Sequence, residues 1–184
     1  MFKYFYGALV VGFLYIAGST VYEKMNKKDF KSSRLACQKE SVTIETFRKP
    51  EKIRDAIKAL KSGNYELKSK IKFSKYMVSQ LGKYLKVEDV DGMIHDAIAA
   101  HHVESSLTDC EVIIDYFVYE NDKEDPGKKT AKSKLYAGFI YLNFKLKDES
   151  VYDVQIDYKD LQAKDLAKRI NCAIASFLSS KNLS

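Results

Sequence analysis

Only two prolines and eight glycines occur among the 184 residues, and there is no tryptophan. So few prolines and glycines exclude collagen-like, proline-rich and Gly/Ser-linker sequences. Gly7 and Gly12 have the spacing of a P-loop, but Phe13 stands where that motif needs lysine. No two glycines are four residues apart, which excludes the nucleophile elbow of α/β-hydrolases. The sequence therefore lacks the common glycine-built catalytic and phosphate-binding motifs.

Cysteine is also scarce and gives no framework. Cys37, Cys110 and Cys172 are far apart, odd in number and form no C-x-x-C pair. Neither a zinc knuckle nor a disulfide scaffold is predicted from such spacing. An odd free thiol is more natural in a reducing compartment, whereas one bridge of unknown pairing could form outside the cytoplasm.

Charge is absent from the stretch between Lys3 and Glu23. As a helix, residues 4–22 would span ~28 Å at ~1.5 Å per residue, close to the ~30 Å hydrocarbon core of a bilayer. Aromatic residues stand at both ends of the stretch, as membrane interfaces favour: Tyr4, Phe5, Tyr6 and Tyr22. Residues 1–22 are therefore predicted to be a transmembrane anchor or an uncleaved signal segment.

A cleavable signal peptide is the competing interpretation, with Ala17 and Ser19 as small residues at its cut site. The flank that follows favours retention, because it is basic and resists translocation. Its basic residues, expected to contact anionic lipid headgroups, are Lys24, Lys27, Lys28, Lys31 and Arg34. We expect a single-pass membrane protein whose soluble domain is either periplasmic or faces the cytosol or matrix.

The distribution of charge argues against a nucleic-acid partner. The first 34 residues carry a net charge of +4, and the whole chain carries +6. The basic character therefore belongs mostly to the flank, whereas a nucleic-acid footprint needs a basic face on the folded domain. We expect residues 23–40 to be a basic juxtamembrane tether and residues 41–184 to be a single domain.

The first half of this domain shows mixed periodicity. Alternating apolar residues predict a strand over Ser41–Arg48, and a helix follows between Pro50 and Gly63. The segment Asn64–Phe73 fits a strand whose outer face is covered with lysine, although part of it also fits a helical stripe. Two further helices are expected over Ser74–Lys86 and Glu88–Ala100.

The second half carries the strongest strand signals. Cys110–Tyr119, Leu135–Leu146 and Tyr152–Tyr158 are rich in β-branched and aromatic residues and predict a three-strand antiparallel meander. A terminal helix is expected from Asp160 to Ser179. The predicted fold class is α+β, in which an N-terminal membrane helix precedes an antiparallel sheet with helices packed on one face. This sheet consists of the meander plus one or two N-terminal strands.

The strand Leu135–Leu146 is apolar on both faces. The terminal helix can cover one face only, so the other is expected to meet more helices, a partner or lipid.

Three histidines limit the possible catalytic chemistry. Asp91, His95 and His102 would share one face of a helix, with Glu104 nearby, and could form part of a metal site. However, His95 and His102 are two turns apart, too far for one ion, and no H-E-x-x-H motif occurs. We therefore expect helix-surface histidines, no metal and no cofactor.

Carboxylates form the other candidate cluster. Asp115, Asp153 and Asp157 lie on the predicted meander, where two facing acids could act as general acid and base. Alternating strands place charges on the solvated face by default, so we expect a solvated surface and no catalytic residues. The loop Glu120–Lys134 has an acidic half followed by a basic half and could grip a charged partner, but a solvated hairpin is the simpler expectation.

These patterns favour a non-enzymatic, membrane-anchored subunit or scaffold of a membrane-associated complex that acts by protein–protein binding near the bilayer. Two alternatives remain open. One is a carrier of lipid or another apolar ligand in the cell envelope, with the two-sided strand lining its cavity. The other is a small hydrolase that uses His95, His101 or His102.

Overall fold

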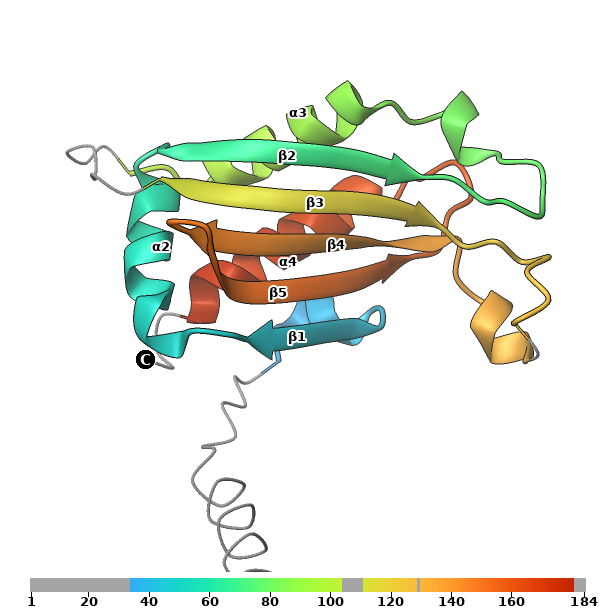
Figure 1. The fold of residues 1–184 in the computed structure, drawn as a ribbon, viewed down its shortest axis with the longest axis horizontal. Helices are drawn as coiled ribbons and strands as arrows, with labels where there is room; N and C mark the ends of the chain where they lie inside the picture. Colours follow the sequence, from blue (N-terminus) through green and yellow to red (C-terminus); the bar gives the residue numbers. More distant parts are fainter. Residues whose placement is uncertain (1–33, 104–110, 129, 181–184) are drawn as a thin grey trace, which may run out of the picture. The chain divides into compact units, whose positions relative to one another are not determined.

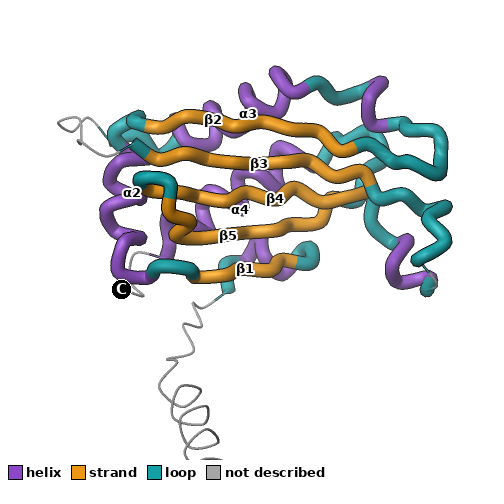
Figure 2. The backbone as a smooth tube through the Cα atoms, in the orientation of Figure 1, coloured by secondary structure: helices purple, strands orange, loops and turns teal. Residues whose placement is uncertain are grey.

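The computed structural model describes residues 34–103, 111–128 and 130–180. They form an α+β fold with a mixed five-stranded sheet in the order β1-β5-β4-β3-β2 (Figures 1 and 2). The strands are β1 (Thr43–Phe47), β2 (Tyr65–Lys72), β3 (Val112–Glu120), β4 (Gly138–Leu146) and β5 (Glu149–Tyr158). The helices are α2 (Ile53–Lys61), α3 (Val87–Ala99) and α4 (Leu166–Ser179), with short 3-10 turns η1 (Ala36–Lys39), η2 (Pro50–Lys52), η3 (Leu81–Lys83) and η4 (Ala131–Lys134).

The predicted meander is present, since β4 pairs antiparallel with both β3 and β5. Lys147 and Asp148 form the turn between β4 and β5, and both have positive φ angles, 51° and 64°. Two such residues give the mirror-image turn whose twist matches that of the strands on either side. Leu146 therefore lies opposite Glu149, which sets the register of this pair.

The sheet is not wholly antiparallel, and that part of the expectation is wrong. β2 pairs parallel to β3, with Tyr65 opposite Val112 and Lys72 opposite Tyr119. The connection between the two strands contains α3, and a helical crossover returns the chain to the end of the sheet where β2 began. β1 joins the opposite edge, antiparallel to β5.

The core lies between the sheet and its helices. α3 and α4 lie on the same side of the sheet, and α2 crosses one end of the strands (Figure 1). Phe144 of β4 stacks on Phe177 of α4 with ring centroids 4.0 Å apart, and both side chains are fully buried. Burying a side chain of this size stabilises the fold by about 1.5–3 kcal/mol. All of these elements belong to the compact unit Ser32–Ser184.

The helix expected over Ser74–Lys86 does not form. The carboxylate of Asp122 accepts hydrogen bonds from the backbone N–H groups of Lys75 and Tyr76, both at 2.6 Å. Glu120 accepts from those of Gln80 and Leu81, at 2.8 and 3.0 Å. In a helix beginning at Ser74, the N–H groups of Gln80 and Leu81 would donate to the carbonyl groups four residues earlier, but both donate to Glu120 instead. We call the Glu120 and Asp122 pair the carboxylate clamp.

The apolar stripe that suggested a helix has another explanation. Leu81 and Leu85 are buried, but Val78 is 78% exposed. The predicted helical spacing therefore does not describe one buried face, and only η3 is helical within this segment.

The start of β4 is also later than predicted. The strand begins at Gly138, since Ala131–Lys134 forms η4. A Cβ atom at Gly138 would overlap the carbonyl oxygen of Tyr119 and the ring of Tyr158. Only glycine therefore allows this close approach of β3 and β4.

Within the described residues, no helix has the length and apolarity needed to cross a bilayer. The predicted anchor, residues 1–22, and most of the basic flank lie outside the described residues. The last residues of the predicted tether are folded: η1 packs against α4.

We expect Glu120→Gln to lower the free energy of unfolding by about 2 kcal/mol, because an amide group would face N–H donors that now bond a buried charge. Burial would raise the pKa of Glu120, but N–H donors from Ser74, Leu81 and Gln80 outweigh it and hold the pKa below its ordinary 4.5. The stabilisation is therefore present above pH 4.5 and is lost as the pH falls through the lowered pKa. Urea unfolding measured against pH checks this.

Glu124→Gln is the matched control, since Glu124 lies in the same loop and is exposed. Equal losses in the two variants would contradict a specific role of the clamp.

Candidate interaction surface

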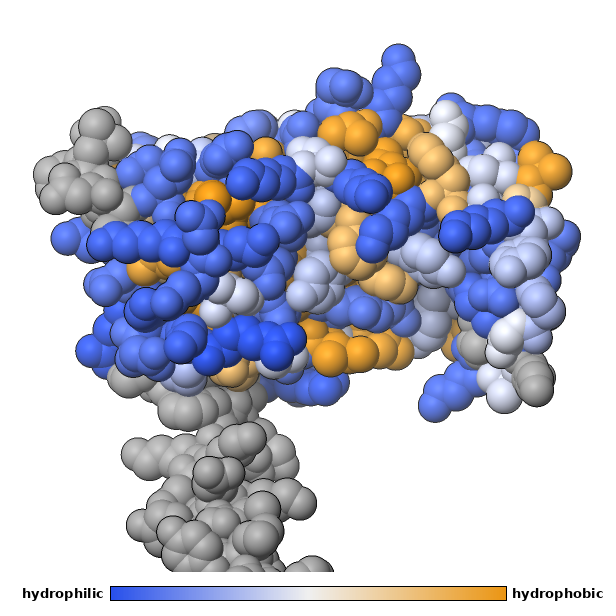
Figure 3. Space-filling model, in the orientation of Figure 1, coloured by the Kyte–Doolittle hydropathy of each residue, from blue (hydrophilic) through white to orange (hydrophobic). Residues whose placement is uncertain are grey.

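The face of the sheet opposite α3 and α4 has no helix over it in the described part of the chain. We call it the open face. Figure 3 views this face and shows apolar residues over the central strands and again over β1, surrounded by polar residues. An uncovered sheet face with apolar side chains is a candidate contact surface.

Four aromatic side chains occupy its centre. Phe117 and Tyr119 of β3 lie beside Phe139 and Tyr141 of β4. The ring centroids of Phe117 are 5.8 Å from Phe139 and 5.2 Å from Tyr141, and those of Tyr119 and Phe139 are 4.9 Å apart. These distances are typical of interacting aromatic pairs. We call these four residues the aromatic cluster; all are partly exposed.

Lysines border the cluster along β2. Lys68, Lys70 and Lys72 are exposed and alternate with the side chains that face the helices. The ammonium group of Lys72 lies 3.3 Å from the ring centroid of Phe117, a cation–π arrangement. The parallel pairing with β3 places this lysine row directly beside the aromatic cluster.

The opposite border of the open face is β1. Ile44 is 54% exposed, and Val42, just before the strand, is 40% exposed. Within the described residues, β1 pairs with β5 only, so its other edge carries no strand. An edge strand with apolar side chains can accept a further strand from a partner.

The predicted carboxylates do not form an acid–base pair. Asp115 bonds Lys145 at 2.8 Å, and Asp153 bonds Arg48 at 2.7 Å. In the register of the sheet, Asn143 of β4 lies between the two acids. Asp153 is not solvated, because its side chain is only 5% exposed. These two acids stabilise the sheet as partners of cations.

Asp157 is set apart from the other two. It lies opposite Phe139 in the register of the sheet. Burial raises the pKa of its carboxyl group, and a hydrogen bond of 3.4 Å from the side-chain amide of Gln155 opposes this shift only in part. The residue lines a shallow groove of about 320 Å³ together with Tyr119, Tyr136 and Phe139. This groove extends the aromatic cluster to the end of the strands.

The candidate metal ligands that were considered on α3, and not expected to bind a metal, do not converge on one point. His95 Nδ1 lies 2.5 Å from the hydroxyl of Tyr65, whereas Asp91 accepts hydrogen bonds from Ser69 and Tyr116. His102 lies at the far end of α3, beside Gly63. Glu104 is outside the described residues. Among those described, no three His, Cys, Asp or Glu side chains converge as metal ligands would.

Two of the four acids in the loop Glu120–Lys134 are directed inward. Glu120 and Asp122 form the carboxylate clamp and are buried. Lys128 donates to the side chain of Asn121 and to the carbonyl oxygen of Asp122. The beginning of this loop therefore holds the chain's own segment 74–81 in place.

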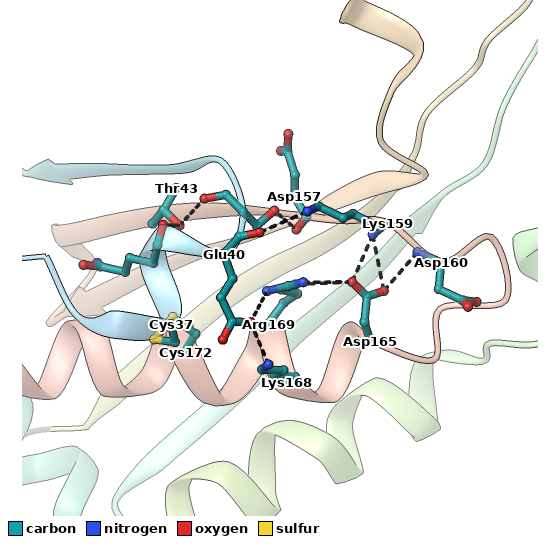
Figure 4. A network of polar contacts seen from close by, with 12 residues as sticks. Cys37, Glu40, Thr43, Asp157, Lys159, Asp160, Asp165, Lys168, Arg169 and Cys172 are labelled. Carbon is teal, nitrogen blue, oxygen red and sulfur yellow. Dashed lines mark hydrogen bonds and ion pairs between the residues drawn. A yellow bond between two sulfur atoms is a disulfide. The ribbon is translucent and has the colours of Figure 1, made fainter.

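A second group of contacts attaches η1 to α4, and Figure 4 shows it. Cys37 and Cys172 form a disulfide across a sequence separation of 135 residues. Beside it, Gln38 donates to the hydroxyl of Ser176 at 2.9 Å. Glu40 bonds Lys168 at 2.6 Å. We call these contacts the N-terminal clasp.

Arg169 connects the clasp to the end of β5. Its buried guanidinium lies 3.4 Å from Glu40 and 3.2 Å from Asp165. Burial would raise the pKa of Asp165, but backbone N–H donors from Lys159 and Asp160, together with Arg169, lower it (Figure 4). Arg169, whose side chain is buried, is thus paired with two carboxylates, as a buried charge requires.

The sequence predicted neither the N-terminal clasp nor the carboxylate clamp. The Cys37–Cys172 pairing had no signal, since three cysteines allow three pairings. For the clamp, a signal was present: two acids at the end of an apolar strand, spaced to point the same way.

No protein-family model matches the chain, and no curated protein sequence matches it. Among solved structures, the chain is similar to a single-residue variant of the PelC dodecamer from Paraburkholderia phytofirmans, with 12% identity and a TM-score of 0.34. The match covers 77% of this chain and 96% of that chain. A TM-score this low supports no inference about function.

Replacing both Cys37 and Cys172 by serine is expected to lower the free energy of unfolding by up to about 5 kcal/mol, because the crosslink closes a long loop in the unfolded chain. Thermal unfolding with and without reductant measures this. Reductant should lower the melting temperature of the natural chain and leave that of the double variant unchanged. If reductant left the melting temperature of the natural chain unchanged, this result would contradict the disulfide.

Proposed function

We propose that the chain is a non-enzymatic, single-span membrane-anchored subunit of a membrane-associated complex. The observation that supports this best is the open face, where the aromatic cluster lies between a lysine row and the unpaired edge of β1. Aromatic side chains contribute a large share of binding energy in protein interfaces, since they bury much area with little loss of entropy. The proposed activity is therefore binding.

The charges around the open face indicate which kind of partner could bind there. Asp115 and Asp153 are paired with cations, whereas the lysine row of β2 has excess positive charge. A partner that offers apolar and acidic side chains complements this pattern, and a basic partner would be repelled. We propose an extended acidic segment, lying along β1 and across the aromatic cluster.

The anchor gives this binding its location. Residues 4–22 would hold the domain at the bilayer, and the basic flank would attract anionic headgroups at ~1 kcal/mol per basic residue. Confinement near the membrane raises the effective concentration of the domain for partners there. The N-terminal clasp supports this role, because the disulfide attaches the segment that follows the proposed anchor covalently to α4.

The clasp also favours one side of the membrane. Disulfides persist in oxidising compartments and are rare in the cytosol. We therefore propose that the domain lies on the extracytoplasmic side, although the basic flank alone favours the cytosolic side. The disulfide is the stronger argument, since a basic flank biases the orientation of a membrane segment only statistically.

Ile44→Glu tests the contact surface. Ile44 is exposed, so the variant should fold normally, but a carboxylate in the proposed interface would repel an acidic partner and be desolvated. We expect at least a tenfold loss of the complex, about the effect of 1.4 kcal/mol. Size analysis of the complex solubilised from membranes that contain the full chain measures it.

Leu161→Glu is the control, because Leu161 is exposed to a similar extent, 49%, and lies between β5 and α4. Loss of the complex in both variants, or in neither, would count against the open face.

Removing residues 1–22 tests the anchor. The compact unit Ser32–Ser184 has its own core, so the shortened chain should fold and move to the soluble fraction. Extraction of the membrane fraction with alkaline carbonate, which releases peripheral proteins, measures this, and carbonate-resistant recovery of the shortened chain in the pellet would exclude the proposed anchor.

A further inference from the structure

The loop between β2 and α3 exposes an unusual set of apolar side chains. Val78 is 78% exposed, Tyr76 60%, Tyr84 51% and Phe73 45%. The loop extends beyond the end of β2 (Figure 1). Residues 73–84, which we call the apolar loop, therefore present their apolar side chains on a projection.

The charge of this region has one sign. Between residues 70 and 86 there is no acid, and the lysines are Lys70, Lys72, Lys75, Lys83 and Lys86. Three of them, Lys70, Lys72 and Lys75, line an open groove of about 570 Å³ at the base of the loop, together with Tyr76 and Tyr119. The groove also contains Asp122 and Asp125.

Neither acid cancels this basic charge fully. The carboxylate of Asp122 accepts from Lys75, Tyr76 and Met77 backbone N–H groups, at 2.6, 2.6 and 3.2 Å. Asp125 accepts from the N–H of Gly127 at 2.8 Å. With three lysines and two carboxylates, the groove carries a net charge of +1 beside the apolar loop.

The carboxylate clamp fixes the shape of the loop. Glu120 and Asp122 together accept hydrogen bonds from the backbone at both ends of segment 74–81. A loop held in this way cannot turn Val78 inward without breaking bonds to buried charges, which is costly. The exposed apolar tip is therefore a fixed feature that needs no ordering when it binds.

We propose that the apolar loop inserts into the interfacial region of an anionic bilayer, with a lipid phosphate group bound by Lys75. Tyrosine and phenylalanine suit the headgroup boundary, a projecting valine suits the acyl region below it, and lysines attract anionic lipid. A flat protein partner would contact the open face, whereas a projecting apolar tip ringed by lysine complements a lipid surface. This site acts in the domain itself, independently of the proposed anchor.

A soluble fragment of residues 32–184 tests the site without the anchor, since this unit contains the whole core. The chain has no tryptophan, so Val78→Trp provides a single fluorescent reporter. With vesicles of phosphatidylcholine and phosphatidylglycerol, we expect its emission to shift to shorter wavelength and to be quenched by brominated acyl chains. Vesicles of phosphatidylcholine alone should give little of either effect.

Val103→Trp is the matched control. Val103 is 51% exposed, and its N–H bonds the carbonyl of Lys61, just before the opposite end of β2. Its tryptophan should stay at the emission of water. A blue shift in both variants, or in neither, would overturn the proposal.

Two further variants separate insertion from simple charge attraction. Val78→Asp should reduce vesicle partitioning by at least about tenfold, because an apolar group is lost from the bilayer. Lys75→Gln should reduce it about fivefold. Equal partitioning of natural and Val78→Asp fragments, with binding abolished by salt, would mean headgroup attraction without insertion and would overturn the proposal. The proposal would also be overturned if the natural fragment did not bind vesicles and Val78→Asp in the full chain abolished the complex, because the loop would then contact a protein partner.

Discussion

The central strand of this domain is apolar on both faces, and the rest of the structure is arranged around that constraint. Ile140, Leu142 and Phe144 face the helices and are fully buried. Phe139 and Tyr141 point the other way, where no described element covers them. An apolar face of a sheet is stabilised by a second layer, and the described part of the chain supplies helices for one face. The aromatic cluster stays stable as an exposed surface because its rings pack on one another and under Lys72.

Much of the fold could be read from periodicity, because each signal had a local cause. Alternation predicted the meander, and Pro50 and Gly63 placed the boundaries of α2. The parallel pairing of β2 was missed because it depends on α3 returning the chain to the opposite end, which is a property of the connection and not of the strand. The helix expected over Ser74–Lys86 failed for a similar reason: its competitor, the carboxylate clamp, lies far along the chain, with Glu120 40 residues from Gln80.

The candidate surface was predictable only in part. The two-sided character of the strand Leu135–Leu146 indicated that its second face would meet more helices, a partner or lipid, and this face carries the aromatic cluster. Its borders could not be predicted, since they depend on which strands lie at the edges. Lys68, Lys70 and Lys72 were expected to coat an outer face, but only the order of the strands places them beside Phe117. The disulfide had no sequence signal that distinguished Cys37–Cys172 from the other pairings.

The buried charged residues of the domain lie where two surface segments are held in fixed positions. Burying a carboxylate or guanidinium costs desolvation free energy. Such a group is therefore expected where an uncharged side chain could not make the same set of hydrogen bonds. Glu120 and Asp122 fix the apolar loop, whereas Arg169 and Asp165 fix the N-terminal clasp. Neither group stabilises the hydrophobic core directly; each determines the position of a segment at the surface. Under the proposed function, one segment connects the domain to its anchor and the other contacts the lipid surface, so the costly interactions lie where the domain must keep a defined relation to the membrane.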